Sequence, residues 1–360
     1  MKIYDLCIIG GGAAALAAAA SIDKDISVVI LEKNEMPGKK IMATGGGRCN
    51  ITNKACPGCD LTLDFFRSRG LETYCDEEGR YYPYSNYAPD VVKILMADIE
   101  KKKADIMTSS KVGSVERIKG GFAVSYGDGH YEIYSRNILL ATGGKAAPQF
   151  GTTGDGYVMA RSLGHSIKRL YPILSGIRCG DFSDIKGIRA RGRASLCRDG
   201  KVIRSEIGEI QFTGDGVSGI CVFNLTPCIK AEEGEPVEKA LKRFTIRLDL
   251  APDFTDGQIR KRASMMGIVT ERLSYRLTAD NIKNWELPVL GVKGWRDAQC
   301  TAGGVSTEEI DMITMESKLV PGLYLAGEII DRHGPCGGYN LQNAWETGIR
   351  AARAINGKIK

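Results

Sequence analysis

The chain has 360 residues, of which 43% are hydrophobic and 26% are charged. This composition is typical of a folded globular protein that buries a large core and divides into two domains. The formal net charge of +6 is too mild to indicate a nucleic-acid-binding protein, although it suits anionic ligands. No basic segment followed by an apolar core opens the chain, and no apolar run is long enough to cross a bilayer.

The cysteines indicate the compartment. Their number, 11, is odd, and they are scattered along the chain. In the absence of a secretion signal this pattern predicts reduced thiols, most of them small buried hydrophobic residues. We therefore expect a cytoplasmic protein that has no membrane segment.

The first informative motif lies at the N-terminus, where an apolar strand ends in a glycine-rich turn and enters an alanine-rich helix. Gly10, Gly12 and Ala15 occupy the small-residue positions of the G-x-G-x-x-G/A dinucleotide fingerprint. Gly10 permits the tight turn, Gly12 lets the backbone approach a pyrophosphate, and Ala15 lets the helix pack closely on the strand. The helix N-terminus, with Ala13 and Ala14, then favours the phosphate charge.

An acidic residue follows at the distance that a dinucleotide site requires. The second apolar run, residues 26–31, ends in Glu32, which lies 20 residues beyond Gly12. An acid there accepts hydrogen bonds from a ribose 2′-hydroxyl, whereas a 2′-phosphate requires a basic residue. The motif therefore predicts FAD or NAD rather than NADP, with Glu32 and the adjacent Lys33 in the site. A glycine turn with a purely structural role is the alternative.

The following part of the chain mixes signals for helices, strands and turns. The expected elements are a loop at 77–86, a helix at 89–103, antiparallel strands at 111–118, 122–126 and 130–134, and a buried strand at 137–141 that rejoins the parallel sheet. A glycine turn ends the last of these strands. From this part we assign five residues to the cofactor site: Val112, Ala141, Thr142, Gly143 and Gly144.

The character of the chain changes after about residue 164. Residues 167–226 alternate like strands, a further strand is expected at 244–250, and two helical stretches are expected between 255 and 277. The chain then returns to glycine- and alanine-rich segments, with a strand at 322–326 and a final helix from about 340 to 355. This order predicts a Rossmann-type domain built from both chain ends around a β-rich insertion.

Further motifs carry a family resemblance. The run Lys39-Lys40-Ile-Met-Ala-Thr44-Gly45-Gly46-Gly47-Arg48-Cys49-Asn50 resembles the signature of the BaiN-like, or YhiN-like, flavoprotein family. Segments 141–156, 301–306, 316–328 and 336–342 also match. The resemblance implies FAD, an FAD domain of the two-dinucleotide-binding flavoprotein kind, and an inserted barrel-like domain. Members are generally called NAD(P)/FAD-dependent oxidoreductases, and their labels range from aminoacetone oxidase to the bile-acid pathway.

We therefore predict an α/β fold with a Rossmann-type FAD-binding domain at 1–165 and 299–360, and a β-rich, barrel-like substrate domain with a short helical part at 166–298. Two features depart from the family. The insertion is short, which leaves little room for the helical subdomain that members usually add, and the loop 331–335 is less acidic. The family's substrate contacts in this loop are therefore not assigned to residues 331–335.

The glycine-rich segments are expected to cradle the flavin. Gly45, Gly46 and Gly47 let the backbone approach the flat ring without interference from Cβ atoms. Arg48 is expected to neutralise the pyrophosphate or a substrate carboxylate, unless it is an ordinary surface arginine. The remaining residues of this loop assigned to the site are Lys40, Thr44, Cys49 and Asn50.

The last helix is expected to point its N-terminus at the flavin. Its dipole would stabilise the negative charge that appears on the N1/C2=O edge upon reduction. Asn340 has an alternative or additional role as a helix cap. The residues assigned to this end of the site are Gly327, Glu328, Gly338, Tyr339, Asn340 and Leu341.

No acid–base or metal-binding constellation stands out, so the catalytic residues stay unassigned and no metal is expected. His130, His165 and His333 are isolated in the sequence. Cys56-Pro-Gly-Cys59 has redox spacing, but a reduced surface loop is the more ordinary interpretation, and no second pair completes a zinc site. A basic cluster in the insertion is interpreted as a solvated strand face, or secondly as a gate for anions: Lys186, Arg189, Arg191, Arg193, Arg198, Lys201 and Arg204.

These observations predict an FAD-dependent oxidoreductase that transfers a hydride between flavin N5 and a C=C or C=O group of a small organic substrate. Only one complete dinucleotide fingerprint is present, so NAD(P)H as a reductant would bind transiently at the flavin face. We expect no nucleic-acid or membrane partner. The alternatives are a flavin-dependent transferase that modifies RNA, and a non-catalytic redox-sensing module that uses Cys56 and Cys59.

Overall fold

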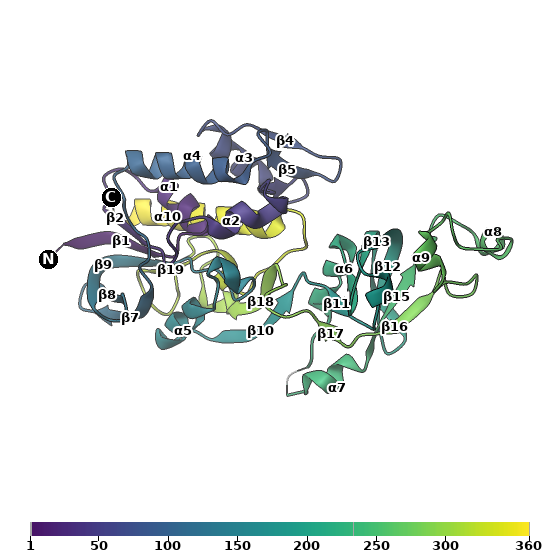
Figure 1. The fold of residues 1–360 in the computed structure, drawn as a ribbon. Coiled ribbons are helices and arrows are strands. Elements are labelled where there is room, and N and C mark those ends of the chain that lie inside the picture. Colours follow the sequence, from purple (N-terminus) through teal and green to yellow (C-terminus); the bar gives the residue numbers. More distant parts are fainter. Residues whose placement is uncertain (1, 233, 360) are drawn as a thin grey trace. The chain divides into compact units, whose positions relative to one another are not determined.

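The computed structural model describes residues 2–232 and 234–359. The chain forms two compact units (Figure 1). The first combines the chain up to Leu170 with the chain from Cys300 onward, and the second consists of Tyr171–Gln299. Among the described residues, no helix has both the length and the apolar content that a membrane span requires.

The first unit is built on a seven-stranded sheet whose core strands are parallel. The apolar run β1 pairs on one side with β2 (Ile8 opposite Ile30) and on the other with β9 (Ile8 opposite Leu139). β19 extends the parallel part by pairing with the end of β9. The strands in spatial order are β6 (Asp105–Met107), β2 (Val28–Leu31), β1 (Ile3–Ile9), β9 (Tyr131–Leu140), β8 (Gly121–Tyr126) and β7 (Val112–Ile118), with β19 (Leu323–Leu325) beside β9.

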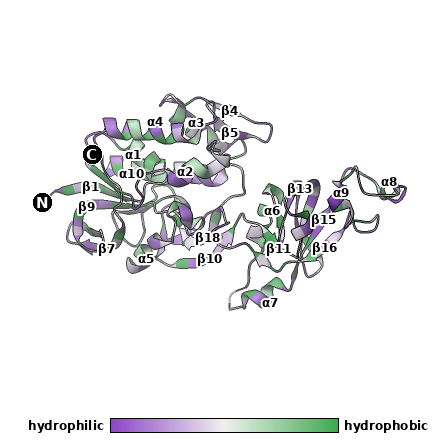
Figure 2. Cartoon of the chain, viewed as in Figure 1, coloured by the Kyte–Doolittle hydropathy of each residue, from purple (hydrophilic) through white to green (hydrophobic). Residues whose placement is uncertain are grey.

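Two helices from opposite ends of the chain pack together beside this sheet: α1 (Ala13–Ser21) and α10 (Tyr339–Ile359) (Figure 1). Their approach is close, because a Cβ atom on Gly348 would lie 2.2 Å from the carbonyl oxygen of Ala14. Hydrophobic residues dominate β1 and α1 (Figure 2), and most residues of both elements are buried. Small residues therefore set the position of α10 against the fingerprint helix.

The other elements of the first unit connect these layers. The helices are α2 (Lys39–Ala43), α3 (Cys59–Arg67), α4 (Ala88–Lys101) and α5 (Asp155–Ser162). The strands β3 (Thr52–Asn53), β4 (Thr73–Cys75) and β5 (Arg80–Pro83) form a small sheet. β18 (Cys300–Val305) pairs with β10 (Ile167–Ile173), which begins in the first unit and ends in the second.

The prediction of a loop or irregular structure over residues 77–86 was wrong for Arg80–Pro83, which form strand β5. This strand pairs with β4, so that Tyr82 lies opposite Tyr74 and their rings stack at 5.9 Å. Aromatic cross-strand pairs of this kind stabilise short antiparallel ladders. The segment is polar and gives no sign of this pairing, because the partner Tyr74 lies outside it.

The second unit is an antiparallel sheet with short helices. Its strands in spatial order are β16 (Trp285–Pro288), β15 (Phe244–Asp249), β12 (Arg189–Arg198), β13 (Lys201–Thr213), β14 (Gly216–Ser218), β11 (Ile177–Arg178) and β17 (Gly291–Val292). Its helices are α6 (Ile220–Phe223), α7 (Val237–Leu241), α8 (Asp256–Arg260) and α9 (Glu271–Ser274). Phe182, Phe212 and Trp285 form an aromatic cluster in its core. The helices expected between 255 and 277 are present but last barely more than one turn each.

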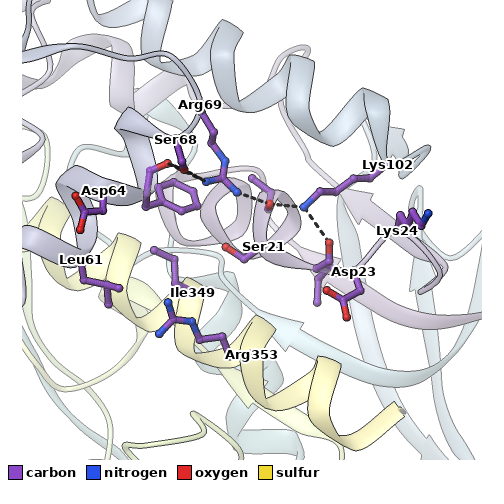
Figure 3. A pocket seen from close by; sticks show the side chains of 13 residues that line it. Ser21, Asp23, Lys24, Leu61, Asp64, Ser68, Arg69, Lys102, Ile349 and Arg353 are labelled. Atoms are coloured by element: carbon purple, nitrogen blue, oxygen red, sulfur yellow. Dashed lines mark hydrogen bonds between the residues drawn. The ribbon is translucent and has the colours of Figure 1, made fainter.

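Two basic side chains hold the carboxyl end of α1. Lys102 Nζ donates to Ala20 O and also to Ile22 O, the latter at 2.9 Å. Arg69 Nη2 donates to Ala20 O at 2.7 Å. They line a cavity of about 490 Å³ at the end of α1 opposite Gly12 (Figure 3). Carbonyl groups at a helix C-terminus lack intrahelical partners and carry negative partial charge, so these cations stabilise the fingerprint helix.

We expect Lys102→Met to lower the free energy of unfolding by about 1–3 kcal/mol, because two carbonyl groups lose a charged hydrogen-bond donor. Lys101→Met is the matched control, since Lys101 is exposed and its replacement should change stability by less than about 0.5 kcal/mol. Urea unfolding of both variants measures the difference. Equal stability of the two variants would contradict this function of Lys102.

Candidate functional site

The turns that follow the parallel strands gather at one edge of the sheet, where ligands of open α/β folds bind. Gly10 follows β1, Ala141 follows β9, and Gly327 follows β19. A Cβ atom on Gly10 would lie 2.6 Å from Ala141 O, so the first two turns are in direct backbone contact. The predicted segments Gly10–Gly12 and Ala141–Gly144 are therefore brought together.

Glu32 at the end of β2 is held rigidly beside the fingerprint turn. Its carboxylate accepts hydrogen bonds from Gly11 N at 2.6 Å and from the backbone and side chain of Asn34, each at 2.7 Å. Only 6% of Glu32 is exposed. This network fixes the carboxylate and leaves it acceptor capacity for a ribose hydroxyl. Nearby, Ser110 N donates to Glu32 O, which places the buried Val112 of β7 next to this end of the site.

The N-terminus of α1 has space in front of it. A Cβ atom on Gly12 would meet nothing within 4 Å, although Gly10 has no such room. The N-cap residue is Gly12, which has no side chain to accept a hydrogen bond from the first amide groups of the helix. An open helix N-terminus next to a glycine whose added Cβ would meet no protein atom fits a phosphate group.

A second glycine cradle lies at the end of α2. Gly45, Gly46 and Gly47 all have positive φ (+59°, +67° and +87°), and Cβ atoms on the latter two would meet nothing within 4 Å. Arg48 lies over the ring of Tyr82 at 4.4 Å and donates through Nε to Gly45 O. The loop thus combines open backbone with an oriented cation. Of the neighbouring predicted residues, Thr44 bonds to Ile41 O, and Cys49 is fully buried.

The N-terminus of α10 packs directly against the end of this cradle. A Cβ atom on Gly338 would lie 2.6 Å from Thr52 O, and the Asn50 amide, in the orientation that satisfies both of its ends, accepts from Gly338 N at 3.0 Å. Tyr339 and Leu341 belong to the first turn of the helix.

Asn340 connects the same helix to the preceding loop. Its Oδ1 accepts from Gly334 N at 2.9 Å, and its Nδ2 donates to the carbonyl oxygens of Gly334 and Pro335. Asn340 is the second helical residue rather than the residue before the helix, and these bonds hold the loop against the helix end. The capping role considered from the sequence is therefore replaced by this connection.

An ion pair joins the remaining predicted residues. Lys40 Nζ lies 2.9 Å from Glu328 Oε2, and Glu328 Oε1 accepts from Thr301 N at 2.9 Å. Thr301 Oγ1 in turn accepts from the backbone of Lys145 and Ala146, beside Gly144. Four segments that are distant in sequence thus meet at one carboxylate. Nothing in the sequence marked Thr301 individually as a residue of the site.

Lys33 faces a different neighbour. Its Nζ donates to Thr153 Oγ1 and to Asp155 Oδ2, both at 2.6 Å. Asp155 begins α5, and the Lys33 ammonium holds the pKa of this carboxyl below its usual range despite the opposing effect of burial. The Lys33 side chain is thus engaged with α5, so its backbone is the part that remains next to Glu32.

His165, Glu309 and Ser317 form a chain of hydrogen bonds that resembles the Ser-His-acid triad of a hydrolase. His165 Nδ1 lies 3.0 Å from Glu309 Oε2, and its Nε2 lies 2.9 Å from Ser317 Oγ. Ser317 Oγ, however, also accepts from Leu319 N and Val320 N, and the residue is buried. A hydroxyl whose lone pairs are both engaged is a poor nucleophile. The cluster therefore connects three chain segments and has no catalytic geometry.

The open space at Gly12, Gly46 and Gly47, the fixed carboxylate and the two helix N-termini together fit a dinucleotide that carries a flat ring. The family model described as the HI0933-like protein Rossmann domain matches residues 58–354. The chain belongs to this family. Among the described residues, no group of three or more His, Cys, Asp or Glu side chains could hold a metal ion.

Relatives of the protein match over nearly their whole length. The chain is 35% identical to a 3-dehydro-bile acid delta(4,6)-reductase of Clostridium scindens, over 96% of this chain and 98% of the relative. It is 28% identical to a ribosomal RNA dihydrouridine synthase of Haemophilus influenzae, over 97% and 98% respectively. In fold it resembles a 3-ketosteroid delta1-dehydrogenase of Sterolibacterium denitrificans, with a TM-score of 0.54, 12% identity and coverage of 99% and 100%.

The family model and the relatives confirm the predicted family, and the solved structure confirms the predicted fold class. The family and the 35% identity to a reductase also confirm the prediction of an FAD-dependent oxidoreductase. The residues that would hold the FAD are those of the fingerprint turn at Gly10–Gly12, the glycine cradle at Gly45–Gly47, Glu32 and the first turn of α10.

Gly12→Ala is expected to fold normally but to bind FAD at least about tenfold more weakly, because the new methyl group occupies the space that the pyrophosphate needs. Gly257→Ala is the matched control, since a Cβ atom there also meets nothing within 4 Å and its φ is ordinary. Flavin absorbance of the purified variants, with thermal unfolding of the apoproteins, measures both effects. Full flavin content in Gly12→Ala would contradict the placement of the phosphates.

Proposed function

We propose that this protein reduces a carbon–carbon double bond conjugated to a carbonyl group in a small organic substrate. The supporting observation is the relationship to the bile acid reductase, which extends over nearly the whole of both chains. That relative's name describes reduction at the delta-4,6 positions of a 3-dehydro compound. The dihydrouridine synthases are named for a product that is also formed by adding two hydrogens to a C=C bond beside a carbonyl.

The chemistry divides between the cofactor and the chain. When bound, the reduced flavin supplies a hydride from N5 to the electron-poor carbon of the double bond. The glycine cradle at 45–47 would hold the ring without steric interference, and the α10 dipole would stabilise negative charge at its edge. The Lys40–Glu328 ion pair fixes the turn after β19 against α2. No residue is assigned as the proton donor.

For the reductant we propose NADH or NADPH, bound transiently. The fingerprint at Gly10–Ala15 is occupied by FAD in this proposal, and the strands β7 to β9 form an antiparallel meander, not a second βαβ unit. A nicotinamide nucleotide would therefore reach the flavin without a dinucleotide domain of its own.

The charges of the second unit favour a small substrate over RNA. Four arginines of the basic cluster are paired with acids of the same unit, which removes much of the free positive charge that phosphate binding requires. The pairs are Arg189 with Glu209, Arg191 with Asp253, Arg198 with Glu232, and Arg204 with Glu206. We accordingly propose no nucleic-acid partner.

Anaerobic mixing tests the reaction. We expect dithionite-reduced protein to be reoxidised rapidly by a steroid dienone, and more slowly by the corresponding saturated ketone. Product analysis should show two added hydrogens at the double bond. Reoxidation at one rate by both compounds would overturn the proposed reaction.

The reductant and the RNA alternative are tested separately. NADH or NADPH is expected to bleach the flavin absorbance under anaerobic conditions, and absence of bleaching by both would exclude direct reduction by nicotinamide. Ribosomal RNA is expected to bind weakly and without a steep dependence on salt. Tight binding that falls sharply with salt would instead support the RNA-modifying alternative, because phosphate contacts release counterions.

A further inference from the structure

The segment Cys56-Pro57-Gly58-Cys59 forms a tight turn at the start of α3. Cys59 N donates to Cys56 O at 3.2 Å, and Gly58 is left-handed, with φ of 74° and ψ of 16°. Proline at the second position and a left-handed glycine at the third define a type II β-turn. Such a turn places the Cα atoms of its first and last residues within about 7 Å. Disulfides bridge Cα atoms about 4.4–6.8 Å apart, so the two thiols are within bonding reach.

This turn is attached to both neighbours of the flavin cradle. Gln342 Nε2, on α10, donates to Gly58 O at 3.2 Å, and Gln342 Oε1 accepts from Thr52 Oγ1 at 2.7 Å. Thr52 belongs to β3, the strand that leaves the cradle, and its carbonyl contacts Gly338. The Cys56 thiol itself lies against the Thr52 hydroxyl and the Asn53 backbone.

We propose that Cys56 and Cys59 form a reversible disulfide, and that its formation weakens the retention of FAD. Bond formation with Cys59 would reposition the Cys56 side chain beside Thr52 and Asn53, and with it the turn that Gln342 holds through the Gly58 carbonyl. Thr52 and Asn53 form the strand next to the N-terminus of α10, so the change reaches the part of the cradle where Asn50 and Gly338 meet. The proposal uses the confirmed FAD binding and does not depend on the substrate.

The oxidant is a low-molecular-weight disulfide such as oxidised glutathione. The Cys59 thiolate attacks it, forming a mixed disulfide and releasing one thiol. The Cys56 thiolate then attacks the Cys59 sulfur, which forms the intramolecular bond and releases the second thiol. The protein loses two electrons and two protons, and the small disulfide is reduced to two thiols.

The exposure of the two thiols determines which cysteine reacts first, and the charges beside them affect the rate of exchange. Cys59 is partly exposed, whereas only 5% of Cys56 is exposed, so Cys59 is the first to react. Burial raises the pKa of both thiols, and the Asp60 carboxylate beside Cys59 and the Glu346 carboxylate near Cys56 add to this. The phenols that face the pair, from Tyr81 and Tyr339, are neutral at moderate pH. Exchange is thus slow at neutral pH and accelerates up to about tenfold per pH unit as thiolate accumulates.

The test uses the FAD-loaded full chain, exposed to oxidised glutathione and then alkylated. We expect a mass loss of about 2 Da before alkylation and, after alkylation and digestion, a peptide that links Cys56 to Cys59, with both changes reversed by dithiothreitol. The dissociation constant for FAD should rise at least about threefold on oxidation. Cys59→Ser should bind FAD normally when reduced and should lose the response to oxidation.

Cys75→Ser is the matched control, because Cys75 is an exposed thiol next to Tyr81, which also faces Cys59. This variant should retain both the crosslink and the change in FAD affinity. Three results would each overturn the proposal: a glutathione adduct that never resolves, a crosslink between Cys59 and Cys75, or a Cys56–Cys59 disulfide that leaves FAD affinity unchanged.

Discussion

The close approach of backbone to backbone at one edge of the parallel sheet is the constraint on which the rest of the structure depends. At Gly10 and Gly338 a single added carbon would collide with a neighbouring carbonyl, and at Gly348 it would push α10 away from α1. These glycines bring the elements of the cradle together. Gly12, Gly46 and Gly47 differ, because a Cβ atom there would meet no protein atom. The first group shapes the site, and the second group leaves it open.

The polar residues around this edge are fixed before any ligand binds. Glu32 is held by Gly11 and Asn34, and Glu328 is held by Lys40 and Thr301. Fixing a carboxylate in the free protein reduces the entropy that is lost when it later accepts a hydroxyl group. Lys102 and Arg69 act at the far end of α1, where they stabilise the helix whose other end would face the phosphates.

The second unit shows how a run of basic residues can mislead. Along β12, arginines alternate with buried small residues, as expected for a strand with one solvated face. Arg189, Arg191 and Arg198 have acidic partners on another strand or in loops, which offsets part of the positive charge that the sequence run implies. The proposal of a small unsaturated carbonyl substrate is consistent with that neutralisation.

Much of the site was predictable because its chemistry is local. The fingerprint at Gly10–Ala15, the acid at Glu32 and the glycine run at 45–47 each have a spacing that dinucleotide binding explains, and the family resemblance joined them to the last helix. Tertiary structure alone decided the strand at Arg80–Pro83, the role of Thr301, the connection made by Asn340 and the assembly around His165. These depend on pairs of residues far apart in the chain, and a contact between two distant segments leaves no pattern in either of them. The sequence therefore determined which cofactor the protein binds, and folding decided which groups hold the cradle in place.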